Sequence, residues 1–195
     1  EGDAFKGNAA TDPQLNPQPG IRNWTPANQS LGLVDYNYPN GQPPDSSRAP
    51  QLGTIFGTNP SQPGAFTNAY KVDGGNWPVS FLCMKTVPGQ AVLAPQTGYN
   101  IGNGFNYLIL YADKNFITLA NFNQDEQNNP QTYNSVLPGY TIHVSGIDVS
   151  PKIIAAYNTY NANRSAGIWP AISAGSVVGT AGSGENCVSI RDSDD

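Results

Sequence analysis

Charged side chains are scarce in this chain. Asp, Glu, Lys and Arg make up only 12% of its 195 residues, about half of the quarter that is usual in a soluble domain. Asn, Gln, Ser, Thr, Gly and Pro take their place, which is typical of secreted proteins with an uncharged polar surface. Because the net charge is -5, neither a nucleic acid nor an anionic membrane surface is expected as a partner.

Long apolar runs and sulfur are also scarce. No apolar run approaches the roughly 20 residues that a membrane-spanning helix needs, so no membrane span is expected. The chain starts at Glu1 without a signal peptide, which fits a mature chain cleaved after export. It has two cysteines and three Asn-X-Ser/Thr sequences. These features favour a secreted, extracellular glycoprotein, with candidate N-glycosylation sites at Asn23, Asn28 and Asn163.

Proline divides the chain into two parts. Residues 1–70 hold ten of the 17 prolines, and no segment among them shows helical or strand periodicity beyond LGLVDY (31–36). We therefore expect an extended, polyproline-rich arm over residues 1–70 and a globular domain over residues 71–195. An arm without a core of its own has to pack either on its own domain or on a neighbouring molecule.

The globular part shows the alternation and turn signals of a β protein. Strands are expected around residues 78–87, 90–95, 106–112, 115–122 and 139–149, followed by two short strands near the C-terminus. Ser150 and Pro151 have the residue types of an N-cap and a first helical position, so we expect one α-helix over about residues 151–162. The predicted fold is mostly antiparallel β-sheet with this single helix.

Three ordered motifs carry a resemblance to a known family: TVPGQAVLAPQTGYNI (86–101), KNFITLANF followed by GYTIHVSGI, and ISAGSVVGTAGSGENCVSIRD (172–192). Residues 77–192 resemble the lysostaphin-type zinc endopeptidases and their inactive relatives, which share the duplicated-hybrid-motif β fold. In the third motif we expect Gly175 and Gly179 to occupy tight turns that need a positive φ.

The resemblance also predicts where a zinc site would lie, and this chain departs from it. The metal-binding His and Asp of the family fall at Val79 and Cys83, and the two histidines of the last motif fall at Glu185 and Cys187. Since valine cannot bind zinc, no metal, no cofactor and no catalytic residue is expected, and Val79, His143 and Glu185 are interpreted as a vestigial site.

The two cysteines are expected to form a disulfide. Both fall at positions that would face the same metal in the family, so the resemblance implies a Cys83–Cys187 bond in place of the zinc. Two cysteines in an exported chain usually pair, which supports the same bond independently of the family. His143 is the only histidine; it falls where active members keep a histidine that assists the water, but a strand histidine hydrogen-bonded within the sheet is favoured.

Three functions from different classes follow. The first is a secreted, non-catalytic structural or assembly protein whose N-terminal arm packs on itself or on neighbouring subunits. The second is an extracellular glycan- or cell-wall-binding module, because three tryptophans and ten tyrosines lie in an Asn-rich sequence. The third is a hydrolase with a rebuilt site, for which Glu185 is a candidate carboxylate without a placed partner. Asp125 and Glu126 are expected to lie in a solvated loop, with calcium binding as the alternative.

Overall fold

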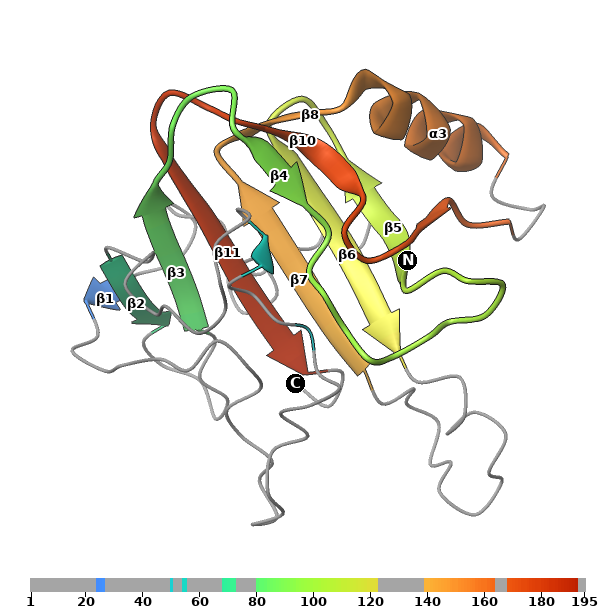
Figure 1. Cartoon of the computed structure of the whole chain (residues 1–195), viewed down its shortest axis with the longest axis horizontal. Coiled ribbons are helices and arrows are strands. Elements are labelled where there is room, and N and C mark those ends of the chain that lie inside the picture. Colours follow the sequence, from blue (N-terminus) through green and yellow to red (C-terminus); the bar gives the residue numbers. More distant parts are fainter. Residues whose placement is uncertain are drawn as a thin grey trace, which may run out of the picture.

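The computed structural model describes residues 24–26, 50, 54–55, 68–72, 80–122, 139–163 and 168–192. These residues form two antiparallel sheets and one α-helix (Figure 1), so the predicted mostly β architecture with a single helix is confirmed for the described part of the chain. The predictions for Asn23, Asn28, Val79, Asp125 and Glu126 concern residues outside this part.

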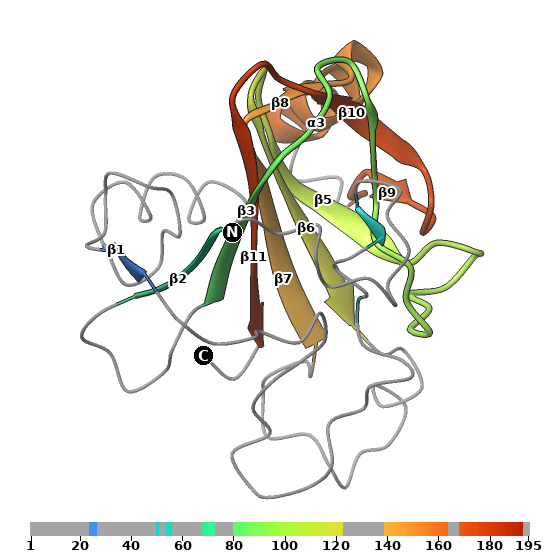
Figure 2. The same ribbon diagram turned by 60° about the vertical axis from the view of Figure 1, so that its left-hand side comes forward.

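The larger sheet has eight strands in the order β1-β2-β3-β11-β7-β6-β5-β9. Figure 2 shows β1 and β2 at the opposite edge of this sheet from β5 and β9. The bounds of its strands are β1 Trp24–Pro26, β2 Asn68–Val72, β3 Ser80–Lys85, β5 Tyr107–Ala112, β6 Phe116–Phe122, β7 Gly139–Ser145, β9 Ala171–Ile172 and β11 Glu185–Asp192.

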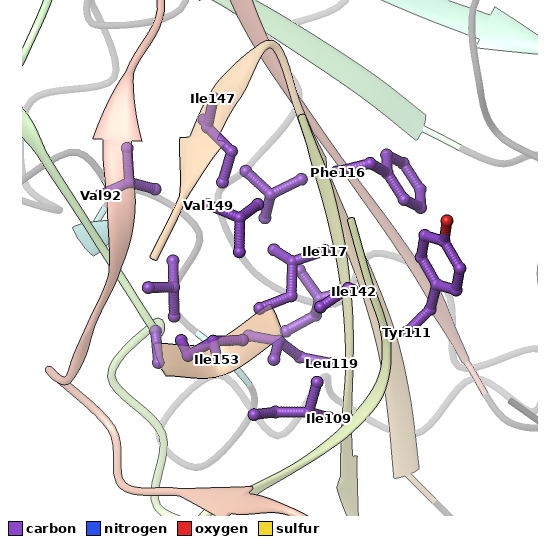
Figure 3. Packing of buried hydrophobic residues seen from close by; sticks show 14 of the residues in the cluster. Val92, Ile109, Tyr111, Phe116, Ile117, Leu119, Ile142, Ile147, Val149 and Ile153 are labelled. Atoms are coloured by element: carbon purple, nitrogen blue, oxygen red, sulfur yellow. The ribbon is translucent and has the colours of Figure 1, made fainter. Parts of the chain in front are cut away.

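The smaller sheet has three short strands in the order β4-β10-β8, with bounds Ala91–Leu93, Val177–Ala181 and Ile147–Val149. Figure 1 shows it in front of β5, β6 and β7. The two sheets enclose an aliphatic core, to which Val92, Ile117, Leu119 and Ile142 each contribute a fully buried side chain (Figure 3). Helix α3 (Pro151–Ala162) follows β8 and buries Ile153, Tyr157 and Tyr160 against the same core.

The helix forms where its sequence predicts. Pro151 occupies the first turn, where its missing N–H costs no helical hydrogen bond. The buried residues 153, 157 and 160 follow the i, i+4, i+7 spacing of one helical face. Ser150 stands at the N-cap position, but its side chain makes no capping hydrogen bond.

Glycine residues account for two differences from the sequence predictions, one in a strand and one in a turn. The segment 139–149 is divided into β7 and β8 at Gly146, which has a φ of 75° and lies against the backbone oxygen of Glu185. The break lets the chain leave the large sheet and enter the small one. Gly175 has the expected positive φ of 77°, whereas Gly179 does not have a positive φ. Glycine is required at 179 because a Cβ there would collide with the backbone oxygen of Asp148.

Short pieces of the Pro-rich segment belong to this fold. β1 pairs with β2, and β2 pairs with β3, so both extend the large sheet. β2 itself spans the boundary expected between residues 70 and 71. Pro50 is buried, and Ile55 is a fully buried member of the main core. In these pieces the segment packs on its own domain.

Candidate functional site

The strand register brings the two cysteines together. β11 lies antiparallel to β3 with Cys187 directly opposite Cys83, and the two sulfur atoms are bonded. Their Cα atoms are 4.1 Å apart, slightly less than the usual range of about 4.4–6.8 Å and near the roughly 4.5 Å of a non-hydrogen-bonded antiparallel pair. The predicted Cys83–Cys187 disulfide is therefore confirmed, and it joins β3 to a central strand of the large sheet.

His143 lies on the face of the sheet that carries the disulfide. Cys187 is opposite Ser145 on β7, and His143 is two residues away on the same strand, so its side chain points to the same side. Its Nδ1 shares a hydrogen bond of 3.0 Å with Thr118 Oγ1, and its ring stacks on Phe116 at 5.9 Å. The imidazole is 3% exposed. It is thus the strand histidine hydrogen-bonded within the sheet that the sequence favours.

Six side chains define what we call the disulfide face. They come from five adjacent strands and are all at least nine-tenths buried: Cys83, Tyr111, Phe116, Thr118, His143 and Cys187. Figure 3 shows Tyr111 and Phe116 on the other side of the strands from Val92, Ile147 and Val149. Tyr111 also contacts Tyr157 of α3 edge to face at 5.4 Å. The disulfide face is therefore on the other side of the large sheet from the aliphatic side chains, although its Tyr111 and Phe116 belong to the same hydrophobic cluster.

The disulfide face does not reassemble a metal site. Neither cysteine keeps a free thiol, and the described residues contain no group of three His, Cys, Asp or Glu side chains that could hold a metal ion. Glu185 is exposed and lies at the start of β11, opposite Lys85 in the strand register. The register separates Glu185 from His143 by four residues along the strand direction, roughly 13 Å, so these two residues of the expected vestigial site do not meet.

A second group of polar side chains fixes the loop between β4 and β5. Asn121 Nδ2 donates to the Asn106 backbone oxygen at 2.7 Å, and Thr97 Oγ1 donates to Asn121 Oδ1 at 3.3 Å. Asn106 Nδ2 donates to the Tyr99 carbonyl, while Asn106 Oδ1 accepts from the Ala174 N–H. These hydrogen bonds use the amides for structure, and they hold residues 97–106 against β6 and the segment before β10.

Tyr107 belongs to the same polar group. Its side chain is fully buried, and its hydroxyl donates to the Pro95 carbonyl at 3.0 Å. Burial raises the pKa of Tyr107 far above its ordinary value, because the phenolate would lose its hydration; a hydrogen bond with Thr97 opposes this shift. The hydroxyl is therefore a structural donor that stays protonated through the physiological pH range.

The fixed loop presents a hairpin to solvent. Asn103 and Gly104 have φ values of 54° and 79°, the two positive angles that a type I′ turn needs. Phe105 follows the turn and is 39% exposed. Ser173 Oγ donates to the Gly104 carbonyl, which ties the tip of the hairpin to the segment before β10.

The tryptophans considered for glycan binding and the candidate glycosylation site Asn163 lie in different surroundings. Trp169 is half-buried and contacts Tyr160 at 4.2 Å between ring centroids, with the rings tilted by 31°, whereas Trp24 forms part of β1. Asn163 is exposed at the C-cap of α3, where its Nδ2 donates to the Thr159 carbonyl at 3.0 Å. This sequon asparagine is therefore on the surface of the described fold.

Sequence reasoning missed two structural groups. The buried Asn121 of β6 follows Ile117 and Leu119 at alternate positions, and this interruption of an apolar series is a signal for a polar contact in the core. Ile55 carried no clear signal, because it lies in a Pro-rich segment whose apolar residues show no periodicity around it. Comparisons with protein-family models, with curated proteins and with solved structures find no match to this chain.

Proposed function

We propose that this chain is a secreted, non-catalytic structural or assembly protein built on a degenerate peptidase-like β domain. The observation that carries the proposal is the Cys83–Cys187 bond. The two sulfurs occupy the positions where the family resemblance expects metal ligands, and both are used in a buried covalent link. A bond that closes a loop of 104 residues suits a domain that has to persist outside the cell.

Secretion is the environment that suits this chemistry. Disulfides form and persist mainly in oxidising compartments, so the bond is compatible with an extracellular location. In the described residues, no helix is long and apolar enough to cross a membrane. Asn163 offers an exposed acceptor for an N-linked glycan at the end of α3.

The side chains that could take part in catalysis support a non-enzymatic role. His143 is 3% exposed and hydrogen-bonded to Thr118, so its buried ring is not accessible to a substrate in solution. The amides of Asn106 and Asn121 are taken up by backbone groups of the domain itself. The polar side chains of His143, Asn106 and Asn121 thus serve to hold strands and loops in place.

The test is an assay of assembly and of activity on the same full-length preparation. Sedimentation over a wide concentration range is expected to show self-association, and peptidoglycan or peptide substrates with added zinc are expected to stay uncleaved. A preparation that remains monomeric at every concentration would contradict the assembly role. Turnover that disappears with a chelator would instead favour a hydrolase with a rebuilt site.

A glycan-binding module is the second candidate, favoured by the hairpin at 102–105. Phe105 is partly exposed there, and Asn100 and Asn103 are exposed residues of the same loop; sugar rings stack on aromatic faces with amides around them. Retention on chitin, cellulose, β-glucan or peptidoglycan, lost on Phe105→Ala, would support this role. No retention on any of the four would exclude it for these glycans.

A further inference from the structure

The hairpin at 102–105 carries an Asn-Gly pair at its tip. Asn103 and Gly104 are both exposed, and they take the two central positions of the turn. In the part of the chain that the structure describes, no hydrogen bond holds the Asn103 side chain or the Gly104 N–H. Asn100 and Asn106 of the same loop, by contrast, use their side-chain amides in hydrogen bonds. Asn103 is thus the asparagine of this loop whose amide and following nitrogen are both available for reaction.

These two groups can react with each other. When the backbone nitrogen of Gly104 attacks Cγ of Asn103, a C–N bond forms and the Cγ–Nδ2 bond breaks. The side-chain nitrogen leaves as ammonia, together with the proton of the attacking nitrogen. Water then opens the resulting succinimide at one of its two carbonyl carbons, which gives aspartate or isoaspartate. Glycine favours the first step because it has no Cβ to shield its nitrogen.

The closed turn holds this reaction back. In a type I′ turn the ψ of the first central residue is about +30°, which points the Gly104 nitrogen away from the Asn103 side chain, so the ring closes only when the hairpin opens. Phe105 makes two backbone hydrogen bonds of 3.0 Å across the hairpin, and Ser173 Oγ donates to the Gly104 carbonyl at 2.8 Å. A Cβ added at Gly104 would lie in open space. Opening the tip therefore breaks a few exposed hydrogen bonds and little packing.

We propose that Asn103 is a site of spontaneous modification, converted to aspartate and isoaspartate through a succinimide with Gly104, at a rate limited by the Ser173 hydrogen bond that keeps the hairpin closed. This inference goes beyond the assembly function and does not depend on it. Both products add one negative charge to a chain whose net charge is -5. Isoaspartate also lengthens the main chain of the turn by one carbon. The converted protein therefore presents a different surface in the loop that carries Phe105.

The experiment follows the full-length protein during incubation in mildly alkaline buffer, where the attacking nitrogen loses its proton more readily. Tryptic cleavage after Lys85 and Lys114 yields one peptide that contains Asn100, Asn103 and Asn106. Mass spectrometry with electron-transfer fragmentation assigns each conversion and distinguishes isoaspartate from aspartate, and a zero-time sample corrects for conversion during digestion. Asn103 is expected to convert ahead of the other two, with isoaspartate among its products. Conversion no faster than at Asn100 or Asn106 overturns the proposal.

Two serine variants test the hydrogen bond to the hairpin. Ser173→Ala removes the donor to the Gly104 carbonyl, so Asn103 is expected to convert roughly two- to tenfold faster, the ratio that corresponds to one hydrogen bond of ordinary net strength. Ser176→Ala is the matched control, because among the described residues its side chain has no hydrogen-bond partner. Circular dichroism checks that both variants are folded. Equal rates in Ser173→Ala and Ser176→Ala overturn the role of Ser173, and the wild-type measurement decides on Asn103 by itself.

Asn103→Gln tests the chemistry of ring closure. Glutamine keeps an amide but has to close a larger ring with Gly104, which is much slower, so no conversion is expected at position 103. In isoelectric focusing the acidic form that accumulates in the wild type should be reduced in this variant. Any remainder reports other asparagines, such as Asn40 of the Asn40–Gly41 pair, which lies outside the described residues. An acidic form that accumulates equally in both proteins would place the conversion elsewhere and overturn the proposal.

Discussion

The two faces of the large sheet are buried by different chemistry. The face toward the small sheet consists mainly of aliphatic side chains from neighbouring strands, and Ile117, Leu119, Ile142, Val144 and Val188 are each at most 1% exposed. The disulfide face carries sulfur, a histidine, a threonine and aromatic rings, and it is also buried. Antiparallel sheets often leave one face in water. Here side chains alternate along β6 and β7, so that one set points to the aliphatic face and the other to the disulfide face, and both faces are buried.

The two faces of the large sheet differ in which properties of their side chains the packing depends on. Aliphatic packing depends on volume and tolerates swaps of similar size, whereas a disulfide and a histidine hydrogen bond depend on the identity of single atoms. The aliphatic face therefore supplies most of the burial energy. The disulfide face selects the register, because a one-residue slip between β3 and β11 would move the two sulfurs to opposite sides.

Loss of the disulfide is expected to have the largest effect. The double variant Cys83→Ser, Cys187→Ser removes a link that closes a loop of 104 residues, and the chain-entropy model assigns about 4–5 kcal/mol to such a loop. Denaturant unfolding of the double variant should show this loss of free energy of unfolding. The wild-type protein, reduced under the same conditions, is the control. A loss below about 1 kcal/mol would show that the disulfide contributes little to the stability of the fold.

Leu119→Ala is the corresponding change on the aliphatic face. The side chain is fully buried in the main core, so its loss leaves a cavity and should cost about 3–5 kcal/mol. Leu119→Met keeps most of the volume and should cost less than about 1.5 kcal/mol. The ratio of the two effects in denaturant unfolding measures how far this face depends on volume. Equal losses for Ala and Met would mean that side-chain shape matters there as much as it does on the disulfide face.

The sequence predicts the part of the fold that depends on periodic patterns. Alternation located β5, β6 and β7, and Pro151 with the spacing of Ile153, Tyr157 and Tyr160 located the helix. The cysteine count indicated the disulfide. The sequence could not predict that Thr118 and His143 are buried, because alternating polar residues normally indicate a solvent-exposed face.

Contacts between segments that are distant along the chain could not be predicted from the sequence. β1, β2 and Ile55 come from a segment without apolar periodicity, and they are held by partners far along the chain. The short β9 forms because Ala171 and Ile172 meet Leu108 and Tyr107 of β5. Such pairings depend on tertiary position, for which a two- or three-residue strand carries no local signal.

Tyr107 lies at the polar end of the aliphatic face, and its contribution to stability can be tested at alkaline pH. Burial raises the pKa of Tyr107 in the folded protein above its value in the unfolded chain. The resulting stabilisation is complete below the unfolded pKa of about 10 and is lost as pH rises above it, because the unfolded chain releases the proton first.

Stability of the wild-type protein should therefore decline above about pH 10 more steeply than that of Tyr107→Phe. At neutral pH the variant should lose about 1 kcal/mol, from the hydrogen bond to the Pro95 carbonyl. Denaturant unfolding at several pH values, with tyrosinate absorbance as a second readout, measures both effects. Parallel pH curves for the two proteins would show that Tyr107 does not control alkaline stability.

Thr118→Val is the smallest change in chemical structure and tests the disulfide face most specifically. Valine keeps the size and branching of threonine but removes the hydroxyl that shares a hydrogen bond with His143 Nδ1. The buried ring loses that partner, so the expected cost is about 1–2 kcal/mol, and Thr118→Ser should recover part of it. Because the chain has only one histidine, nitrogen NMR of the imidazole reports this contact without ambiguity. The ring signals should shift in Thr118→Val and stay close to those of the wild type in Thr118→Ser. A Thr118→Val protein as stable as the wild type, with unchanged ring signals, would mean that the disulfide face is held by packing alone, as the aliphatic face is.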